Sequence, residues 1–194
     1  MKLKFNQEGL IPAVLQDAKT GKVLMLGYMN KEALKRTKRD KKVWFWSRSR
    51  KKLWLKGETS GHTLEMVRVE ADCDRDALLV LAHPSGPTCH LDRASCFPEA
   101  PSDFLAELDA LVGERERTRP AGSYTSSLFG SGTKRIAQKV GEEGVETALA
   151  AVIGEESELL GEAADLIYHL TVLLRSRSLS LRAAVDVLKS RGHA

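Results

Sequence analysis

The spacing of the apolar residues changes once along this chain, at Pro98-Glu99-Ala100-Pro101. Before this point, short apolar segments alternate with glycine- and proline-containing connections, which predicts strands. After it, apolar residues recur at helical spacing over long segments, which predicts helices. Two prolines within four residues form a short, stiff spacer. The sequence therefore predicts two domains, a β-rich α+β domain over residues 1–98 and an all-α helical bundle over residues 102–194.

The expected elements follow the same division. In the first domain, strands are predicted over residues 10–15, 23–29, 43–47, 53–56, 63–69 and 78–82. Asn30 is a candidate N-cap for a short helix between the second and third strands. In the second domain, a helix from residue 102 precedes a loop over residues 115–122, and longer helices are predicted over residues 133–153, 155–175 and 180–191.

Composition excludes several classes of protein. The chain is 42% hydrophobic and 29% charged, so it can bury a core and is not intrinsically disordered. The longest apolar run, Val23–Met29, is far shorter than the roughly 18 residues that a membrane span needs. Three cysteines do not suit the disulfide framework of a secreted protein. We therefore expect a soluble, cytoplasmic protein with no membrane partner.

A basic and aromatic segment points to an anionic ligand. Twelve of the 26 residues from Lys31 to Lys56 are Lys or Arg, against two acidic residues. Such a stripe attracts a nucleic acid or a phosphorylated small molecule. Its tryptophans either stack on a base or pack into the core. The following Gly57-Glu58-Thr59-Ser60-Gly61 resembles a loop that binds an anion.

Cysteines and aspartates gather in one part of the first domain. In Asp72-Cys73-Asp74-Arg75-Asp76, an extended backbone would put the three carboxylates on one face and Cys73 on the other. Such carboxylates repel one another unless a cation lies among them, and oxygen ligands suit Mg²⁺. Thiolates prefer zinc, and three of them would leave one coordination position open, as in catalytic sites. Buried structural cysteines are the alternative. His90, beside Cys89, could be an acid/base group or a fourth ligand.

Two acidic patches lie about twenty residues apart in the helical half. Glu142, Glu143 and Glu146 occupy neighbouring positions of one predicted helix, and Glu162 and Asp165 those of the next. Antiparallel packing across Gly154 would bring the patches together. Mg²⁺ between them would remove their repulsion and could bind a polyphosphate. A solvated acidic face is the alternative.

Taken together, these motifs resemble the bifunctional histidine-biosynthesis enzymes that join phosphoribosyl-AMP cyclohydrolase to phosphoribosyl-ATP pyrophosphohydrolase. The N-terminal motifs are Trp46-Ser47-Arg48-Ser49-Arg50, Lys56-Gly57-Glu58-Thr59-Ser60-Gly61, Asp72-Cys73-Asp74-Arg75-Asp76, Cys89-His90 and Cys96-Phe97. The C-terminal motifs are Tyr124-Thr125, Leu128-Phe129, Lys139-Val140-Gly141-Glu142-Glu143, Glu146, Glu162-Ala163-Ala164-Asp165-Leu166 and Tyr168-His169-Leu170. The similarity covers nearly the whole chain, although residues 38–42 are more basic than the family pattern.

The resemblance implies two consecutive reactions. The helical domain (102–194) would hydrolyse phosphoribosyl-ATP to phosphoribosyl-AMP and pyrophosphate. Its Mg²⁺ would be held by Glu142, Glu143, Glu146, Glu162 and Asp165, with Glu143 also catalytic. The β-rich domain (1–98) would then open the adenine ring by attack of zinc-bound hydroxide at C6.

The resemblance also implies the residues and assembly of the second reaction. The zinc ligands would be Cys73, Cys89 and Cys96, contributed by both subunits of a homodimer, and Asp72, Asp74 and Asp76 would bind Mg²⁺. His90 is the candidate proton shuttle. The substrate-binding residues would be Trp46, Arg48, Ser49, Arg50, Lys56, Glu58, Thr59 and Ser60.

Two other functions are compatible with parts of the sequence. A zinc-stabilised RNA-binding module would explain the basic stripe but not the acidic helices; we expect no specific nucleic-acid binding. A general nucleotide pyrophosphatase would explain the helices but not the cysteines.

Overall fold

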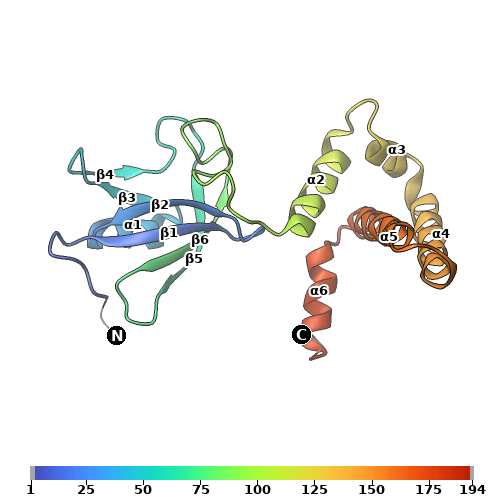
Figure 1. Ribbon diagram of the computed structural model, residues 1–194. Helices are drawn as coiled ribbons and strands as arrows, with labels where there is room; N and C mark the ends of the chain where they lie inside the picture. The colour runs from blue at the N-terminus through green and yellow to red at the C-terminus, as the bar shows by residue number, and fades with distance from the viewer. Residues whose placement is uncertain (1–2, 193–194) are drawn as a thin grey trace. The chain divides into compact units, whose positions relative to one another are not determined.

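The computed structural model describes residues 3–192, and its contacts divide the chain into two compact units, 1–103 and 104–194. All the strands lie in the first unit, and all but one of the described helices lie in the second (Figure 1). The predicted fold class is therefore confirmed: an N-terminal β-rich α+β unit is followed by an all-α unit. Each unit is described by itself below.

A four-stranded sheet organises the first unit. Its strands are β1 (Ile11–Asp17), β2 (Val23–Met29), β5 (Leu64–Ala71) and β6 (Leu78–Pro84), in the order β2-β1-β6-β5. The central pair, β1 and β6, is parallel, whereas both outer pairs are antiparallel. A separate antiparallel hairpin is formed by β3 (Trp44–Ser47) and β4 (Lys52–Leu55). All six strands lie where the sequence predicts them, and every strand end is within two residues of its predicted position.

Helix α1 (Lys31–Asp40) connects the sheet to the hairpin. Asn30 caps it as predicted, because the side-chain oxygen of Asn30 accepts a hydrogen bond of 2.8 Å from the backbone N–H of Ala33. Thr37 is fully buried, and its hydroxyl accepts a hydrogen bond from the backbone N–H of Trp44. This bond fixes the start of β3 against the helix, and thereby the hairpin that carries the basic and aromatic residues.

Alternating side chains of the strands form the core of the first unit. In β1, Ile11, Ala13 and Leu15 are fully buried, whereas the residues between them are partly exposed. Phe45 of β3 packs so closely on Gly27 of β2 that a Cβ atom there would lie 2.3 Å from the Phe45 ring. The hairpin is therefore held against the sheet through a site where only glycine fits without rearrangement.

The second unit contains five helices: α2 (Phe104–Thr118), α3 (Tyr124–Gly130), α4 (Gly132–Ile153), α5 (Glu156–Ser176) and α6 (Leu181–Ser190). Its small core consists of Val112, Leu128, Phe129, Ile136 and Val172. The partly buried pair between Arg175 and Asp109 joins α5 to α2. Within the part of the chain that the structure describes, no helix is both long and apolar enough to cross a membrane.

Two expectations for the second unit are corrected. Helix α2 extends to Thr118, so the predicted loop over residues 115–122 is shorter than expected. Helix α3 was not predicted, because Ser123–Ser127 is rich in hydroxyl residues that favour turns. In the structure, the Ser123 side chain instead caps α3 by accepting a hydrogen bond from the backbone N–H of Ser126.

Candidate active sites

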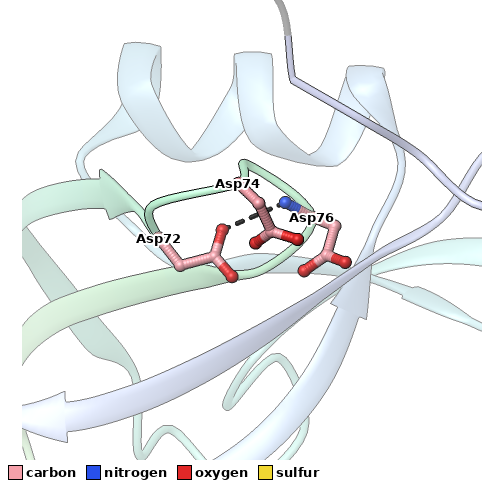
Figure 2. Close-up of side chains that lie close together, drawn as sticks. All are labelled: Asp72, Asp74 and Asp76. Carbon is pink, nitrogen blue, oxygen red and sulfur yellow. Dashed lines mark hydrogen bonds between the residues drawn. The ribbon is translucent and has the colours of Figure 1, made fainter.

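The three aspartates come together in the connection between β5 and β6, but in a turn rather than an extended segment (Figure 2). The Asp72 carboxylate accepts hydrogen bonds of 3.0 Å and 3.1 Å from the backbone N–H groups of Asp76 and Ala77. Arg75 adopts a left-handed backbone conformation (φ 68°), which completes the turn. The extended backbone that the sequence argument considered for this segment is therefore not present, because the Asp72 side chain accepts hydrogen bonds from backbone donors that a strand would pair elsewhere.

The turn still brings the carboxylates close to one another. Asp72, Asp74 and Asp76 are exposed, and each offers an oxygen within 4.8 Å of the others. Hydrogen bonds to its carboxylate, first from the backbone of Ala77, lower the pKa of Asp72. The negative charge of Asp74 is the main cause of a raised pKa at Asp76. A cation among these oxygens would relieve that repulsion.

The cysteines divide into two places in the first unit. Cys89 is buried and neighbours Cys96, whereas Cys73 is exposed in the aspartate turn. Partial burial of its thiol, and then the neighbouring Cys89, raise the pKa of Cys96. In the described part of one chain, the cysteines do not form a three-thiol group that could hold a metal. A three-cysteine zinc site would therefore need Cys73 from a second chain.

Lys56 faces the Cys89 and Cys96 pair. Only 8% of Lys56 is exposed, and burial lowers the pKa of its amino group although both cysteines act in the opposite direction. His90 is exposed, with its Nδ1 3.9 Å from the Cys89 sulfur. The site thus combines two thiols, a buried amine and an imidazole.

Two neighbouring cavities contain the predicted substrate-binding residues. A cavity of about 440 Å³ is lined by the two neighbouring cysteines, His90, Lys56 and the loop that contains Glu58, Thr59 and Ser60. A larger one of about 1030 Å³ is lined by Trp46, Arg48 and Ser49. Arg50, Trp54 and Met25 line both cavities, so the two adjoin at these side chains.

The tryptophans of the basic segment serve different purposes. Trp46 and Trp54 line cavities, and Trp54 also packs on the core. Trp44 lines neither cavity; it packs on the core and donates a hydrogen bond of 3.0 Å from its indole N–H to Asp40. Tyr28, which the sequence did not single out, places its ring 4.0 Å from the Arg48 guanidinium. Nothing in the local sequence relates Tyr28 to Arg48, since Tyr28 lies on β2 and Arg48 lies in the turn that follows β3.

The acidic patches of the second unit meet where α4 and α5 pack together. Glu143 and Glu146 of α4 and Glu162 of α5 each offer an oxygen within 4.8 Å of the others. A hydrogen bond from Lys139 is the main cause of a lowered pKa at Glu143. Burial, and then the charge of Glu146, raise the pKa of Glu162. Three carboxylates in such surroundings could hold a hard cation.

Two of the predicted acidic ligands lie outside this group. The Glu142 carboxylate contacts Arg135 and Lys139 at 3.1 Å and 3.0 Å, and it accepts a hydrogen bond from Gln138. Asp165 is not a member of the three-residue group, and its backbone carbonyl accepts a hydrogen bond from His169. The geometry therefore separates the five predicted acids into a facing set of three and two residues beside it.

Comparison with known proteins identifies both units. Residues 25–98 match the family model of phosphoribosyl-AMP cyclohydrolase, and residues 105–192 match that of phosphoribosyl-ATP pyrophosphohydrolase. These matches, together with the β-rich and helical units, define a bifunctional hydrolase with one catalytic domain per reaction.

Full-length relatives identify the particular family. The chain is 62% identical to the histidine biosynthesis bifunctional protein HisIE of Xylella fastidiosa strain Temecula1, over 95% of this chain and 89% of the relative. It is 54% identical to HisIE of Salmonella typhimurium strain LT2, over 95% and 92% of the two chains. The chain belongs to this family of bifunctional histidine-biosynthesis enzymes, with cyclohydrolase and pyrophosphohydrolase activities. The resemblance recognised in the sequence is thus confirmed.

Proposed function

We propose that the domain over residues 102–194 hydrolyses phosphoribosyl-ATP to phosphoribosyl-AMP and pyrophosphate at the Glu143, Glu146 and Glu162 group. The packing of three carboxylates on two helices supports a Mg²⁺ site there, with Glu142 and Asp165 beside it. Magnesium, when bound, would neutralise charge on the leaving pyrophosphate. Glu143 is ionised at neutral pH because Lys139 lowers its pKa, and it is the proposed acceptor of a proton from the attacking water.

The domain over residues 1–98 is proposed to open the adenine ring of the product, phosphoribosyl-AMP. Its thiols support zinc, which prefers sulfur ligands, and the aspartate turn supports Mg²⁺, which prefers oxygen. Bound zinc would supply a hydroxide near neutral pH as the nucleophile for C6. His90, exposed at the rim of the cavity beside Cys89, would move the proton.

The two adjoining cavities suit the shape and charge of this substrate. Phosphoribosyl-AMP carries two phosphates, one on each side of its purine. In the larger cavity, Arg48 and Arg50 would bind one phosphate, with Ser49 and Trp46 beside them. In the smaller cavity, the loop with Glu58, Thr59 and Ser60 would contact the other end of the substrate. Lys56 would keep a positive charge near the reacting ring.

A homodimer with zinc ligands from both subunits is part of the proposal. Cys89 and Cys96 neighbour each other, and Cys73 lies in the separate aspartate turn. A tetrahedral zinc ion with three thiolates would therefore require Cys73 of a second copy. Thiols that bind zinc need a reducing compartment, which supports the cytoplasm as the location.

Separate substitutions test the assignment of the two sites. With each substrate supplied separately, Cys89→Ser is expected to abolish ring opening and leave pyrophosphate release at the wild-type rate. Glu143→Gln is expected to do the reverse, because each residue lies in its own unit. Circular dichroism of both variants controls for folding. If either substitution in a folded protein removes both activities, the two-site proposal is wrong.

A further inference from the structure

The carboxylate of Glu143 is surrounded by groups that do not belong to the acidic site. Glu143 and His169 are 5% and 4% exposed, and both lie in the helical unit. Glu143 Oε1 lies 2.5 Å from Lys139 Nζ and 3.5 Å from His169 Nδ1. Oε1 of Glu143 is thus in contact with two side chains outside the acidic group.

The orientation of the His169 ring is determined by hydrogen bonds at both nitrogens. Nδ1 lies 2.9 Å from the backbone carbonyl of Asp165, which can only accept, so Nδ1 carries a proton. Nε2 forms a hydrogen bond of 3.1 Å with the hydroxyl of Tyr124. The Tyr124 ring also meets the His169 ring edge-on, with centroids 6.1 Å apart. The Asp165 carbonyl therefore fixes the proton on Nδ1, and Tyr124 fixes the tilt of the His169 ring.

We propose that Tyr124 and His169 are positioning residues that hold the Glu143 carboxylate in the orientation needed to bind a divalent cation. This inference rests on the proposed function of the acidic group. The contacts connect three helices: Tyr124 begins α3, Glu143 lies on α4, and His169 lies on α5. Partners that orient a metal ligand in this way contribute strongly to metal affinity.

The neighbouring Tyr168 offers a matched control. Its hydroxyl hydrogen-bonds to the hydroxyl of Thr125 at 2.8 Å, and its ring stacks on that of Tyr124 with centroids 6.3 Å apart. Tyr168→Phe and Tyr124→Phe thus each remove one hydroxyl and one hydrogen bond between α3 and α5. Only the Tyr124 hydroxyl, however, bonds to His169.

The test measures Mn²⁺ binding to the full-length protein by calorimetry. The difference between wild type and Glu162→Gln defines binding at the acidic group. Tyr124→Phe is expected to weaken the affinity of the acidic group for Mn²⁺ about tenfold, which is the lower end of such effects at metal sites. His169→Phe should weaken it at least as much, whereas Tyr168→Phe should bind as wild type does. The Mg²⁺ concentration for half-maximal pyrophosphate release should shift by the same factors.

Three outcomes would contradict the proposal, and they are distinguishable. Wild-type affinity in Tyr124→Phe would show that the hydroxyl does not position Glu143. Equal weakening in Tyr124→Phe and Tyr168→Phe would attribute the loss to packing of α3 on α5. If Glu162→Gln binds Mn²⁺ as the wild type does, the result would instead contradict the proposed function of the acidic group, on which the inference rests.

Discussion

At the scale of single residues, the carboxyl groups between α4 and α5 differ in their affinity for protons. Lys139 lowers the pKa of Glu143, whereas burial and the charge of Glu146 raise the pKa of Glu162. Of these two proposed ligands, Glu162 is therefore the first to gain a proton as the pH falls. A protonated carboxyl group is a poor metal ligand, so protons would compete with the proposed Mg²⁺ at this residue.

This competition predicts a pH-dependent Mg²⁺ requirement. The Mg²⁺ concentration for half-maximal pyrophosphate release should rise as the pH is lowered through the raised pKa of Glu162, and it should be constant well above that value. Initial rates over a Mg²⁺ series at each pH measure the effect. Glu158→Gln is the control: it removes one of the negative charges that raise the pKa of Glu162 without removing a proposed ligand, so it should shift this dependence to lower pH. A requirement for Mg²⁺ that is independent of pH in the wild type would contradict the assignment.

At the scale of elements, the contact between β2 and β3 predicts a local stability effect. Gly27→Ala would place a Cβ atom 2.3 Å from the buried Phe45 ring, so the ring or the strand must move. Overpacking of this kind typically costs about 1–3 kcal/mol of unfolding free energy. Gly141→Ala is the control, because a Cβ there meets no atom within 4 Å. In a helix, alanine is more favourable than glycine by about 1 kcal/mol. Urea unfolding should show opposite changes; a wild-type midpoint for Gly27→Ala would contradict the prediction.

Most elements were predictable from the sequence because their signals are local. Alternation in β1, the Asn30 cap and the long helical spacing of α4 and α5 each depend on residues close together in the chain. Helix α3 and the aspartate turn were not predictable, because side-chain hydrogen bonds of Ser123 and Asp72 decide them. The approach of Tyr124 to His169, 45 residues apart, depends on how three helices pack, and no local pattern records it.

At the scale of the whole molecule, the proposed sharing of zinc ligands between two subunits predicts complementation between inactive variants. Cys73→Ser and Cys89→Ser should each abolish ring opening. In a mixed dimer, one of the two sites would be intact, because the Cys89→Ser chain supplies its Cys73 and the Cys73→Ser chain supplies its Cys89. Random exchange of equal amounts should therefore restore about a quarter of wild-type ring opening. Co-refolding followed by a ring-opening assay measures this; no recovery, despite mixed dimers, would contradict sharing.

The presence of two catalytic units also predicts which products the purified protein forms from phosphoribosyl-ATP. The central claim is that two separate sites of one protein carry out consecutive reactions. Mass spectrometry of the products formed from phosphoribosyl-ATP with Mg²⁺ and Zn²⁺ tests it most directly. The account predicts pyrophosphate and a ring-opened product in equal amounts at completion. Phosphoribosyl-AMP that accumulates without ring opening, in folded and metal-loaded protein, would contradict it.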